Sequence, residues 1–297
     1  MSANVGFVGI GNMGWPMAAR LVQAGYNVAV TDISGERCRA FAEQIGGIAS
    51  STPAAVADRS DILITMLPTS AAVENAVTGP DGVLSTLHQG ALVIEMSSGT
   101  PAATQRIAGA VTQAGGSLID APVSGGVTRA ESGDLAIMVG GSLQHIDQAK
   151  PILLNFGRSI VQTGGVGSAH AMKALNNITS AAGFLIGIEA LLIGKRLGLD
   201  PSTMVDILNA SSGMNNSTQK KFKQFVLSRK FDAGFSLDLM VKDISIALDV
   251  ARETATPAPF AALCREIWTG AQRSLGPGRD HTELARYSEQ MAGSTLS

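Results

Sequence analysis

Short apolar runs recur along the first half of the chain and are separated by longer stretches in which apolar and polar residues follow a helical period. The apolar runs have the length of buried strands, and they lie at residues 5–8, 28–31, 62–66, 91–95, 117–120, 135–139 and 159–162. The stretches between them have the pattern of helices, at residues 13–24, 35–45, 69–77, 101–114 and 143–154. Strands that alternate with helices in this way predict an α/β fold of the doubly wound, Rossmann type, with a mostly parallel sheet covered on both faces.

The pattern changes after Gly164 and Gly165, where strand-like runs give way to helical periodicity. Helices are predicted at residues 168–197, 201–209, 218–227, 237–254, 259–273 and 282–291. We therefore expect two domains, a Rossmann-type domain over residues 1–164 and an all-helical domain over residues 165–297.

The first predicted strand runs directly into a glycine-rich turn, Gly9-Ile10-Gly11-Asn12-Met13-Gly14, and the second strand ends at Asp32. This order of strand, turn, helix, strand and acid is the fingerprint of dinucleotide binding. Gly9 allows the tight turn, Gly11 leaves room for a pyrophosphate near the helix N-terminus, and Gly14 lets the helix approach the strand. The turn predicts a nucleotide cofactor.

Asp32 bears on which cofactor is used. A carboxylate at the end of the second strand accepts hydrogen bonds from the ribose hydroxyls of NAD and repels the 2′-phosphate of NADP. No arginine follows it directly, although Arg37 comes soon after. Asp32 and Ser34 are equally good caps for the next helix, so a purely structural role competes with this interpretation. The sequence favours NAD over NADP.

Composition limits the alternatives. The chain has 297 residues and a net charge of −2, which gives no sign of a nucleic-acid or membrane surface. Cys38 and Cys264 fit no metal-ligand spacing, so we expect no metal site and a reducing, cytoplasmic compartment. The start of the chain lacks the pattern of a signal peptide. Residues 178–194 are apolar, but they are interrupted by Glu189 and are short for a membrane span, so a buried helix is the better interpretation.

Three segments outside the fingerprint carry polar groups that could do chemistry. Ser124-Gly125-Gly126 follows a strand, and its backbone amides could bind an anion, although an ordinary glycine turn has the same sequence. Lys173 and Asn177 are four residues apart and share one face of the long helix. The apolar residues after them would desolvate Lys173 and lower its pKa, which suits a proton shuttle.

Other interpretations of these segments remain open. A lysine near the start of a helix is more often a solvated charge, and His170, one turn earlier, is a weaker rival as acid or base. Without other information, Lys242 and Asp243 on a later amphipathic helix are interpreted as a surface charge pair.

Taken together, these segments resemble the β-hydroxyacid dehydrogenase family, which includes 3-hydroxyisobutyrate dehydrogenases and tartronate semialdehyde reductases. The resemblance covers nearly the whole chain. It rests on the glycine turn with the Pro16-Met17 that follows it, Met66-Leu67-Pro68, Met96-Ser97-Ser98, the segment from Asp120 to Gly126, Lys173 with Asn177, and Lys242-Asp243. One departure is Ala169, where the family usually has a glycine before the lysine.

The resemblance implies a role for each matched residue. Lys173 would be the catalytic acid or base and Asn177 would hold the substrate, while Ser124, Gly125 and Gly126 would bind its carboxylate. The cofactor would be bound by the following residues: Gly9, Gly11, Asn12, Met13, Gly14, Asp32, Met66, Leu67, Pro68, Ser97 and Lys242. The implied reaction is hydride transfer between NAD and a small 3-hydroxy acid, 3-hydroxyisobutyrate-like, or semialdehyde reduction in reverse. An imine reductase of the same architecture and a non-catalytic NAD-binding module are the alternatives.

The helical half raises two further expectations. Family members are typically dimers or tetramers, and the apolar helix at residues 168–197 carries Gly183, Gly187 and Gly194, which would permit close helix contact. We therefore expect a homodimer or homotetramer with the helical domains at the interface. The polar run at residues 211–218 lies where the family varies its specificity. The lysines at positions 220, 221 and 223 either form a solvated helix face or receive an anionic substrate tail.

Overall fold

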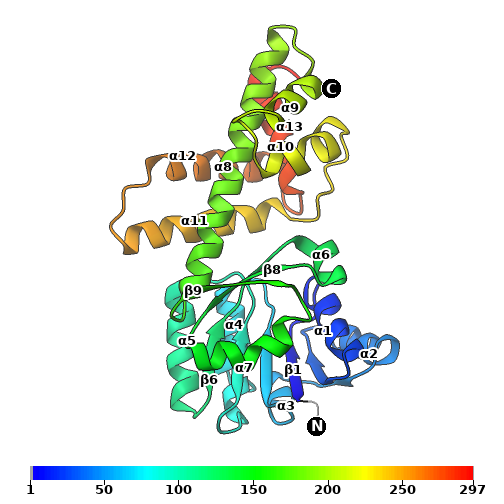
Figure 1. Cartoon of the computed structure of the whole chain (residues 1–297), viewed down its shortest axis with the longest axis vertical. Helices are drawn as coiled ribbons and strands as arrows, with labels where there is room; N and C mark the ends of the chain where they lie inside the picture. The colour runs from blue at the N-terminus through cyan, green and yellow to red at the C-terminus, as the bar shows by residue number, and fades with distance from the viewer. Residues whose placement is uncertain (1–2, 297) are drawn as a thin grey trace. The chain divides into compact units, whose positions relative to one another are not determined.

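The computed structural model describes residues 3–296 of the chain. These form two compact units that divide after Lys173, and the long helix α8 (Ser168–Arg196) runs through the division. The first unit is α/β and the second is helical, which confirms the predicted fold class (Figure 1).

The first unit is built on one sheet. Its strands are β1 (Asn4–Val8), β2 (Asn27–Thr31), β3 (Ile48–Ala49), β4 (Ile62–Thr65), β5 (Leu92–Glu95), β6 (Ser117–Asp120), β7 (Val123–Ser124), β8 (Ala136–Gly140) and β9 (Ser159–Gly164). The order is β3-β2-β1-β4-β5-β6-β8-β7, with β9 pairing with β8. In this order the strands from β3 to β6 pair in parallel, whereas β8 is antiparallel to β6 and β7. The strand order reverses direction between β1 and β4, which is the place where doubly wound sheets bind ligands.

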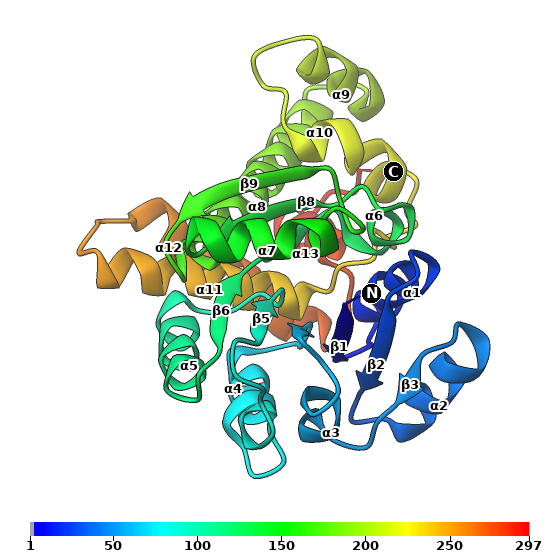
Figure 2. The ribbon, with the colours of Figure 1, turned by 60° about the horizontal axis from the view of Figure 1, so that its bottom comes forward.

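Helices cover both faces of this sheet. They are α1 (Gly14–Gln23), α2 (Gly35–Gln44), α3 (Pro53–Ala57), α4 (Ser70–Thr78), α5 (Pro101–Gln113), α6 (Gly126–Ser132) and α7 (Leu143–Leu153), with a short 3₁₀ turn at Val83–Ser85. Alternate residues of each strand face opposite sides, so Ile62 and Ile64 pack with α1, α2 and α7 while Leu63 packs with α3, α4 and α5. Figure 2 shows α3, α4 and α5 on one side of the sheet and α1, α6 and α7 on the other.

The second unit continues from α8 with α9 (Pro201–Asn209), α10 (Asn216–Lys220), a π-helical turn at Phe222–Leu227, α11 (Leu237–Glu253), α12 (Pro259–Leu275), a 3₁₀ turn at His281–Glu283 and α13 (Leu284–Ala292). Its core gathers around the fully buried Phe184 of α8, whose ring lies 5.3 Å from that of Phe222 and 6.0 Å from that of Trp268. The single helix expected at residues 218–227 is instead α10 followed by the π-helical turn, and the change occurs at Lys221.

The glycines of α8 face residues of the same chain. A methyl group at Gly187 would lie 2.6 Å from the ring of Phe222, and one at Gly194 would lie 2.3 Å from Met204. Gly183 faces Asn215 at 3.5 Å. Neighbours in the same chain therefore occupy the space beside Gly187 and Gly194, so the expectation that these two glycines receive a second copy of the chain is wrong, whereas Gly183 leaves room for a methyl group.

By length and composition alone, α8 is the one helix of the described residues that could cross a membrane. Half of its most apolar window is buried inside the protein. Its partners in the core identify it as a buried helix of a folded unit, as the interrupting Glu189 indicates.

Candidate functional site

The turn between β1 and α1 is held against the end of β4 by glycine. Gly9 has φ +94°, and a methyl group there would lie 2.4 Å from the carbonyl oxygen of Met66 and 2.7 Å from Leu67. A methyl group at Gly14 would lie 2.0 Å from the carbonyl oxygen of Gly9. Both positions therefore require glycine, and they bring the two turns Gly9–Gly14 and Met66–Leu67 together at the point where the strand order reverses.

Gly11 in the same turn is different, because no described atom lies within 4 Å of the position that a methyl group would take. Among the described residues, no side chain caps the N-terminus of α1, whose N-cap is Met13. The amide of Trp15 donates to the carbonyl of Gly11, and Pro16 has no N–H, so the open surface consists of the amides from Gly11 to Gly14. This is the arrangement that binds a pyrophosphate, so these residues fit a dinucleotide cofactor.

Asp32 follows β2 and faces the same turn. Its Oδ2 accepts a hydrogen bond from the Ile10 amide at 2.9 Å, and its Oδ1 accepts one from the Ser34 amide at 3.0 Å. The N-cap of α2 is Ser34, whose Oγ accepts a hydrogen bond from the Arg37 amide. The capping alternative for Asp32 is thereby removed. Its carboxylate is oriented by two amides and has lone pairs left for hydroxyl donors.

Arg37 is the nearest cation along the chain after Asp32. Its Nε donates to the carbonyl of Ile10 at 2.6 Å, and its guanidinium lies 5.6 Å from the centre of the Trp15 ring. The side chain is therefore held over α1.

Ser97 connects two of the segments that the sequence assigned to the cofactor. Its Oγ accepts a hydrogen bond from the Leu67 amide at 2.9 Å, and its side chain is buried. Ser97 follows β5 and Leu67 follows β4, so this bond ties the ends of neighbouring strands. Pro68 comes next and is exposed.

A buried charge cluster lies beside Ser97 and fixes the start of α8. His170 Nε2 is 2.8 Å from Glu95 Oε2 and 2.9 Å from the carbonyl oxygen of Ser97, and its Nδ1 is 2.7 Å from Thr104 Oγ1. Asp120, at the end of β6, accepts hydrogen bonds from the His170 amide at 3.0 Å and from another amide of the turn before α8. The side chains of Glu95, Asp120 and His170 are at most 2% exposed. The first turn of α8, which leads to Lys173, is thus attached to β5, β6 and α5.

The hydrogen bonds define the charge of His170. The Thr104 hydroxyl donates to the carbonyl of Thr100, so it accepts from Nδ1–H, while Nε2 faces two acceptors. Both nitrogens are therefore donors, and the ring is an imidazolium. Although burial opposes it, the Glu95 carboxylate and its hydrogen bond raise the pKa of His170. Burial likewise opposes ionisation of Glu95, but His170 and the bonds from Ser97 lower the pKa of Glu95 below its ordinary value.

Asp120 behaves in the opposite way. Burial raises the pKa of Asp120, and this exceeds the lowering by His170 and by the backbone amides of Gly167 and His170. Because both ring nitrogens of His170 are engaged and the side chain is 1% exposed, this histidine is a structural cation rather than a proton shuttle.

The predicted anion loop lies at the junction of β7 and α6. Ser124 ends β7, and α6 begins at Gly126 with Gly125 as its N-cap. Gly125 has φ +146° and Gly126 has φ +72°, conformations that L side chains rarely adopt. Both glycines are exposed and Ser124 is half-buried. The segment thus presents a hydroxyl group beside two exposed glycines.

Lys173 and Asn177 lie one turn apart on the same face of α8. Asn177 is 8% exposed. Its Nδ2 donates to Asp243 Oδ2 at 2.5 Å, and Asp243 Oδ1 lies 3.2 Å from Lys242 Nζ. Lys242 and Asp243 are therefore not a surface pair, since α11 buries Asp243 against the amide that the sequence assigned to the substrate.

Sequence reasoning did not include three of these residues among the site residues. The sequence presents Asp243 only as the neighbour of Lys242, although its position on α11, three residues after the buried Met240, places it on the buried side of that helix. Glu95 and Asp120 each end a strand in the same way that Asp32 follows one, and this shared position was the available signal.

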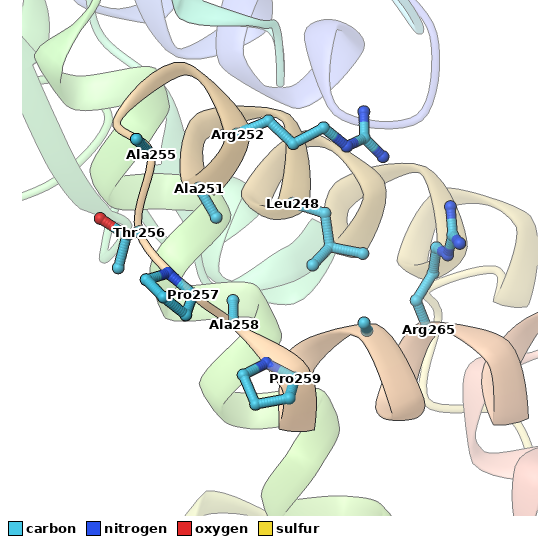
Figure 3. A pocket seen from close by; sticks show the side chains of 10 residues that line it. Leu248, Ala251, Arg252, Ala255, Thr256, Pro257, Ala258, Pro259 and Arg265 are labelled. Atoms are coloured by element: carbon cyan, nitrogen blue, oxygen red, sulfur yellow. The ribbon is translucent and has the colours of Figure 1, made fainter.

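A groove of about 570 Å³ lies elsewhere in the second unit, at the end of the α11–α12 hairpin (Figure 3). Its lining is mostly apolar and includes Leu248, Pro257 and Pro259 with the arginines 252 and 265. None of the residues discussed above lines it.

The open turn at Gly11, the anchored carboxylate of Asp32 and the strand order define a dinucleotide-binding Rossmann unit. Such a unit is typical of nicotinamide-dependent oxidoreductases.

Comparison with known proteins gives the family. Residues 4–165 match the model described as the NAD binding domain of 6-phosphogluconate dehydrogenase, and residues 167–288 match the one described as NAD-binding of NADP-dependent 3-hydroxyisobutyrate dehydrogenase. The chain is 37% identical to 2-(hydroxymethyl)glutarate dehydrogenase of Eubacterium barkeri, over 100% of this chain and 98% of the relative. It is also 37% identical to the human mitochondrial 3-hydroxyisobutyrate dehydrogenase, over 89% of this chain and 80% of that protein.

A solved structure of Mycobacterium tuberculosis 3-hydroxyisobutyrate dehydrogenase with L-serine is similar with a TM-score of 0.88 and 29% identity, over 97% of this chain and 99% of the other. The chain belongs to the β-hydroxyacid dehydrogenase family, and hydroxyacid oxidoreduction is favoured over the imine reductase and non-catalytic alternatives.

Proposed function

We propose that this enzyme uses NAD to oxidise a 3-hydroxy acid whose hydroxyl is on a primary carbon, and that Lys173 is its catalytic acid or base. The observation that carries the proposal is the shared face of α8, on which Asn177, oriented by Asp243, lies one turn after Lys173. The names of the relatives, 3-hydroxyisobutyrate and 2-(hydroxymethyl)glutarate dehydrogenase, support a hydroxymethyl group next to a carboxylate.

In the oxidative direction, the neutral amine of Lys173 accepts the hydroxyl proton of the substrate as the C–H hydride leaves the same carbon. A bound nicotinamide supplies the hydride acceptor. Ser124 Oγ and the amides of Gly125 and Gly126 bind the substrate carboxylate, and Asn177 donates to a substrate oxygen. In the reductive direction, Lys173 returns its proton to the oxygen of the carbon that receives the hydride. A positioned acid or base of this kind contributes about 10²–10⁴ in rate.

The cofactor is assigned to the first unit. The pyrophosphate binds at the amides of Gly11, Asn12, Met13 and Gly14. Asp32 accepts hydrogen bonds from the adenosine ribose hydroxyls, and its negative charge repels a 2′-phosphate. The arrangement Met66–Pro68 with Ser97 supports the nicotinamide end, and Lys242 contacts the cofactor.

The experiment for Lys173 compares the Lys173→Ala variant with Lys195→Ala, which removes a lysine near the far end of the same helix. With 3-hydroxyisobutyrate and NAD, Lys173→Ala is expected to lose about 10³-fold or more in kcat, whereas Lys195→Ala keeps the wild-type rate. NAD binding, followed by titration calorimetry, is expected to persist in both. A Lys173→Ala enzyme that retains more than roughly a tenth of the wild-type kcat at any pH rules out the assignment.

Cofactor preference is tested by the ratio of kcat/KM for NAD to that for NADP. The ratio is expected to favour NAD in the wild type and to fall in Asp32→Ser, because the repulsion of the 2′-phosphate is lost. Glu36→Ser on α2 removes a nearby exposed charge and serves as the control. A wild-type preference for NADP contradicts the proposal and points to Arg37 as the phosphate ligand.

We also propose a homodimer or homotetramer. The helix α8 and the turn after it carry exposed apolar side chains, between 43% and 78% accessible, at Met172, Leu175, Ile186, Ile193 and Leu197. Exposed apolar side chains gathered on one helix are commonly covered by a symmetric partner. Light scattering at micromolar concentration tests the assembly, and a mass near the 30.5 kDa of one chain contradicts it.

A further inference from the structure

The three lysines that follow the polar run are not equivalent. Lys220 is exposed at the end of α10, and Lys223 is exposed and pairs with Asp206 at 2.6 Å. Lys221 is half-buried, and its Nζ lies 3.4 Å from Ser180 Oγ on α8 and 5.9 Å from the centre of the Phe184 ring. Of the three, Lys221 alone is directed onto α8.

The surrounding chain fixes this position from both sides. Asn215 caps α10, because its Oδ1 accepts hydrogen bonds from the amides of Ser217 and Thr218, and its Nδ2 donates to the carbonyl of Gly183 at 3.4 Å. Phe222, the residue after Lys221, places its ring in the space left by Gly187. Lys221 therefore lies between α10 and a π-helical turn, and the residues Asn215 before it and Phe222 after it both contact α8. Such π-helical turns are frequent at functional sites.

The ammonium has no dedicated counter-ion within the described part of the chain. The nearby carboxylate is Asp280, and its oxygens accept hydrogen bonds from the amides of Gly234, Phe235 and Thr282 and from the Thr282 hydroxyl. No ion pair between Lys221 and a described carboxylate is present. Asp280 thus serves the loops around it rather than neutralising Lys221.

The local charges agree with this geometry. Burial lowers the pKa of Lys221 to about 8, and the Asp280 charge opposes this only in part. Burial, and then the charge of Lys221, lower the pKa of His281 to about 4, so this histidine is neutral and adds no cation. A desolvated ammonium without a paired anion gains from an anionic ligand.

Helical register relates Lys221 to the reacting end of the substrate. Lys173, Asn177 and Ser180 recur at intervals of four and three residues, so they lie on one face of α8. Ser180 lies about 10 Å beyond Lys173 along the helix axis. If the substrate makes a hydrogen bond of about 2.8 Å near Lys173 and another near Ser180, its two polar groups are about 5 Å apart. A short aliphatic chain spans this distance.

We propose that Lys221 binds a second carboxylate at the far end of the substrate, so that the preferred 3-hydroxy acid is a dicarboxylate. This inference rests on the proposed function, because it takes Lys173 as the group that contacts the hydroxyl. Lys221 is then a specificity residue: it binds the non-reacting end of the substrate and takes no part in proton transfer.

The test uses two compounds that differ only at the distal group, 2-(hydroxymethyl)glutarate and its analogue with the distal carboxylate converted to the primary amide. The wild type is expected to have a kcat/KM for the dicarboxylate roughly 10–100-fold above that for the amide. In Lys221→Met this preference is expected to disappear, mainly through a higher KM for the dicarboxylate, and Lys221→Arg is expected to retain most of it. Lys220→Met and Lys223→Met are matched controls that keep the wild-type preference.

The outcomes separate the two proposals. Equal kcat/KM for acid and amide in the wild type overturns the role of Lys221 while the proposed function stands, and this comparison holds even if Lys221→Met does not fold. A Lys221→Met variant that loses activity equally with both compounds also overturns it, because the lysine then acts only in folding. Failure of the wild type to oxidise these compounds and 3-hydroxyisobutyrate with either nicotinamide cofactor overturns the proposed function, and this inference with it.

Discussion

Replacing His170 with alanine is expected to destabilise the first unit strongly, because it removes the cation from a buried pair. Glu95 Oε2 lies 2.8 Å from the ring, and the carboxylate is 2% exposed. Without the imidazolium, Glu95 still accepts hydrogen bonds from the Ser97 amide at 2.9 Å and from the Thr65 hydroxyl at 3.4 Å, but its charge has lost the paired cation. Removing one partner of a buried ion pair costs about 3–5 kcal/mol. For a unit of this size, at about 2–4 °C per kcal/mol, the midpoint of thermal unfolding falls by roughly 6–20 °C.

A double-mutant cycle on the same cluster distinguishes loss of the ion pair from simple loss of packing. Introducing Glu95→Gln into the wild type is expected to lower the midpoint, because His170 loses its anion. In the His170→Ala background the same change is expected to raise stability by about 1–3 kcal/mol, since no stranded charge remains. Circular dichroism melts of the four proteins measure this. If Glu95→Gln lowers the midpoint equally in both backgrounds, the two side chains do not form a stabilising ion pair.

The dependence on pH follows from the shifts. The pKa of His170 is raised in the folded protein, so its contribution is complete below the unfolded pKa and is lost as pH rises through the folded value. The pKa of Glu95 is lowered, so its contribution is present above its unfolded pKa and is lost as pH falls through the folded value. Asp120, whose pKa is raised, favours folding only in its protonated form. The difference in free energy of unfolding between the wild type and His170→Ala is therefore largest between about pH 4.5 and 6.5. A difference that stays the same at high pH contradicts the positive charge assigned to His170.

Four other substitutions test contacts of the substrate amide, of the long helix and of the glycine turn. Asp243→Ala is expected to lower kcat/KM for the hydroxy acid by roughly 10–100-fold with a smaller effect on the KM of the nucleotide, and equal effects in steady-state assays would argue against substrate orientation. Gly187→Ala is expected to destabilise by about 1–3 kcal/mol through overlap with Phe222, whereas Gly183→Ala stabilises by about 0.5–1 kcal/mol through helix propensity, and melts that shift in the same direction contradict this. Gly11→Ala is expected to leave the melting midpoint unchanged but to raise the nucleotide KM roughly 10-fold or more, so normal nucleotide binding would place the pyrophosphate elsewhere.

Much of the fold could be predicted from sequence because its central strands are apolar runs buried on both faces. The apolar runs at β1, β4 and β5 fall within a residue or two of the observed bounds. The two-residue strands β3 and β7 and the helices α3 and α6 were not predicted, because elements of two to seven residues are too short to show a period. The antiparallel pairing of β8 depends on the loop at Gly125 and Gly126, whose backbone conformations no hydrophobic pattern reveals.

The residues of the candidate site also fall into those that the sequence could predict and those that it could not. Gly9, Gly11 and Asp32 could be located because their chemistry depends on neighbours along the chain. The pairing of Asn177 with Asp243 could not, since it joins helices that are far apart in sequence. Lys221 shows the limit most clearly. Its neighbours are the same type of residue, but Lys220 ends α10, Lys223 lies within the π-helical turn, and both are exposed.

The cluster around His170 also bears on how related sequences can diverge. A lineage that exchanges either Glu95 or His170 alone passes through a protein with an uncompensated charge in its interior. Such an intermediate is expected to be selected against, although the proposed reaction uses neither side chain. The residues at positions 95 and 170 are therefore expected to vary together among related proteins. Relatives with an uncharged residue at one position are expected to have an uncharged residue at the other.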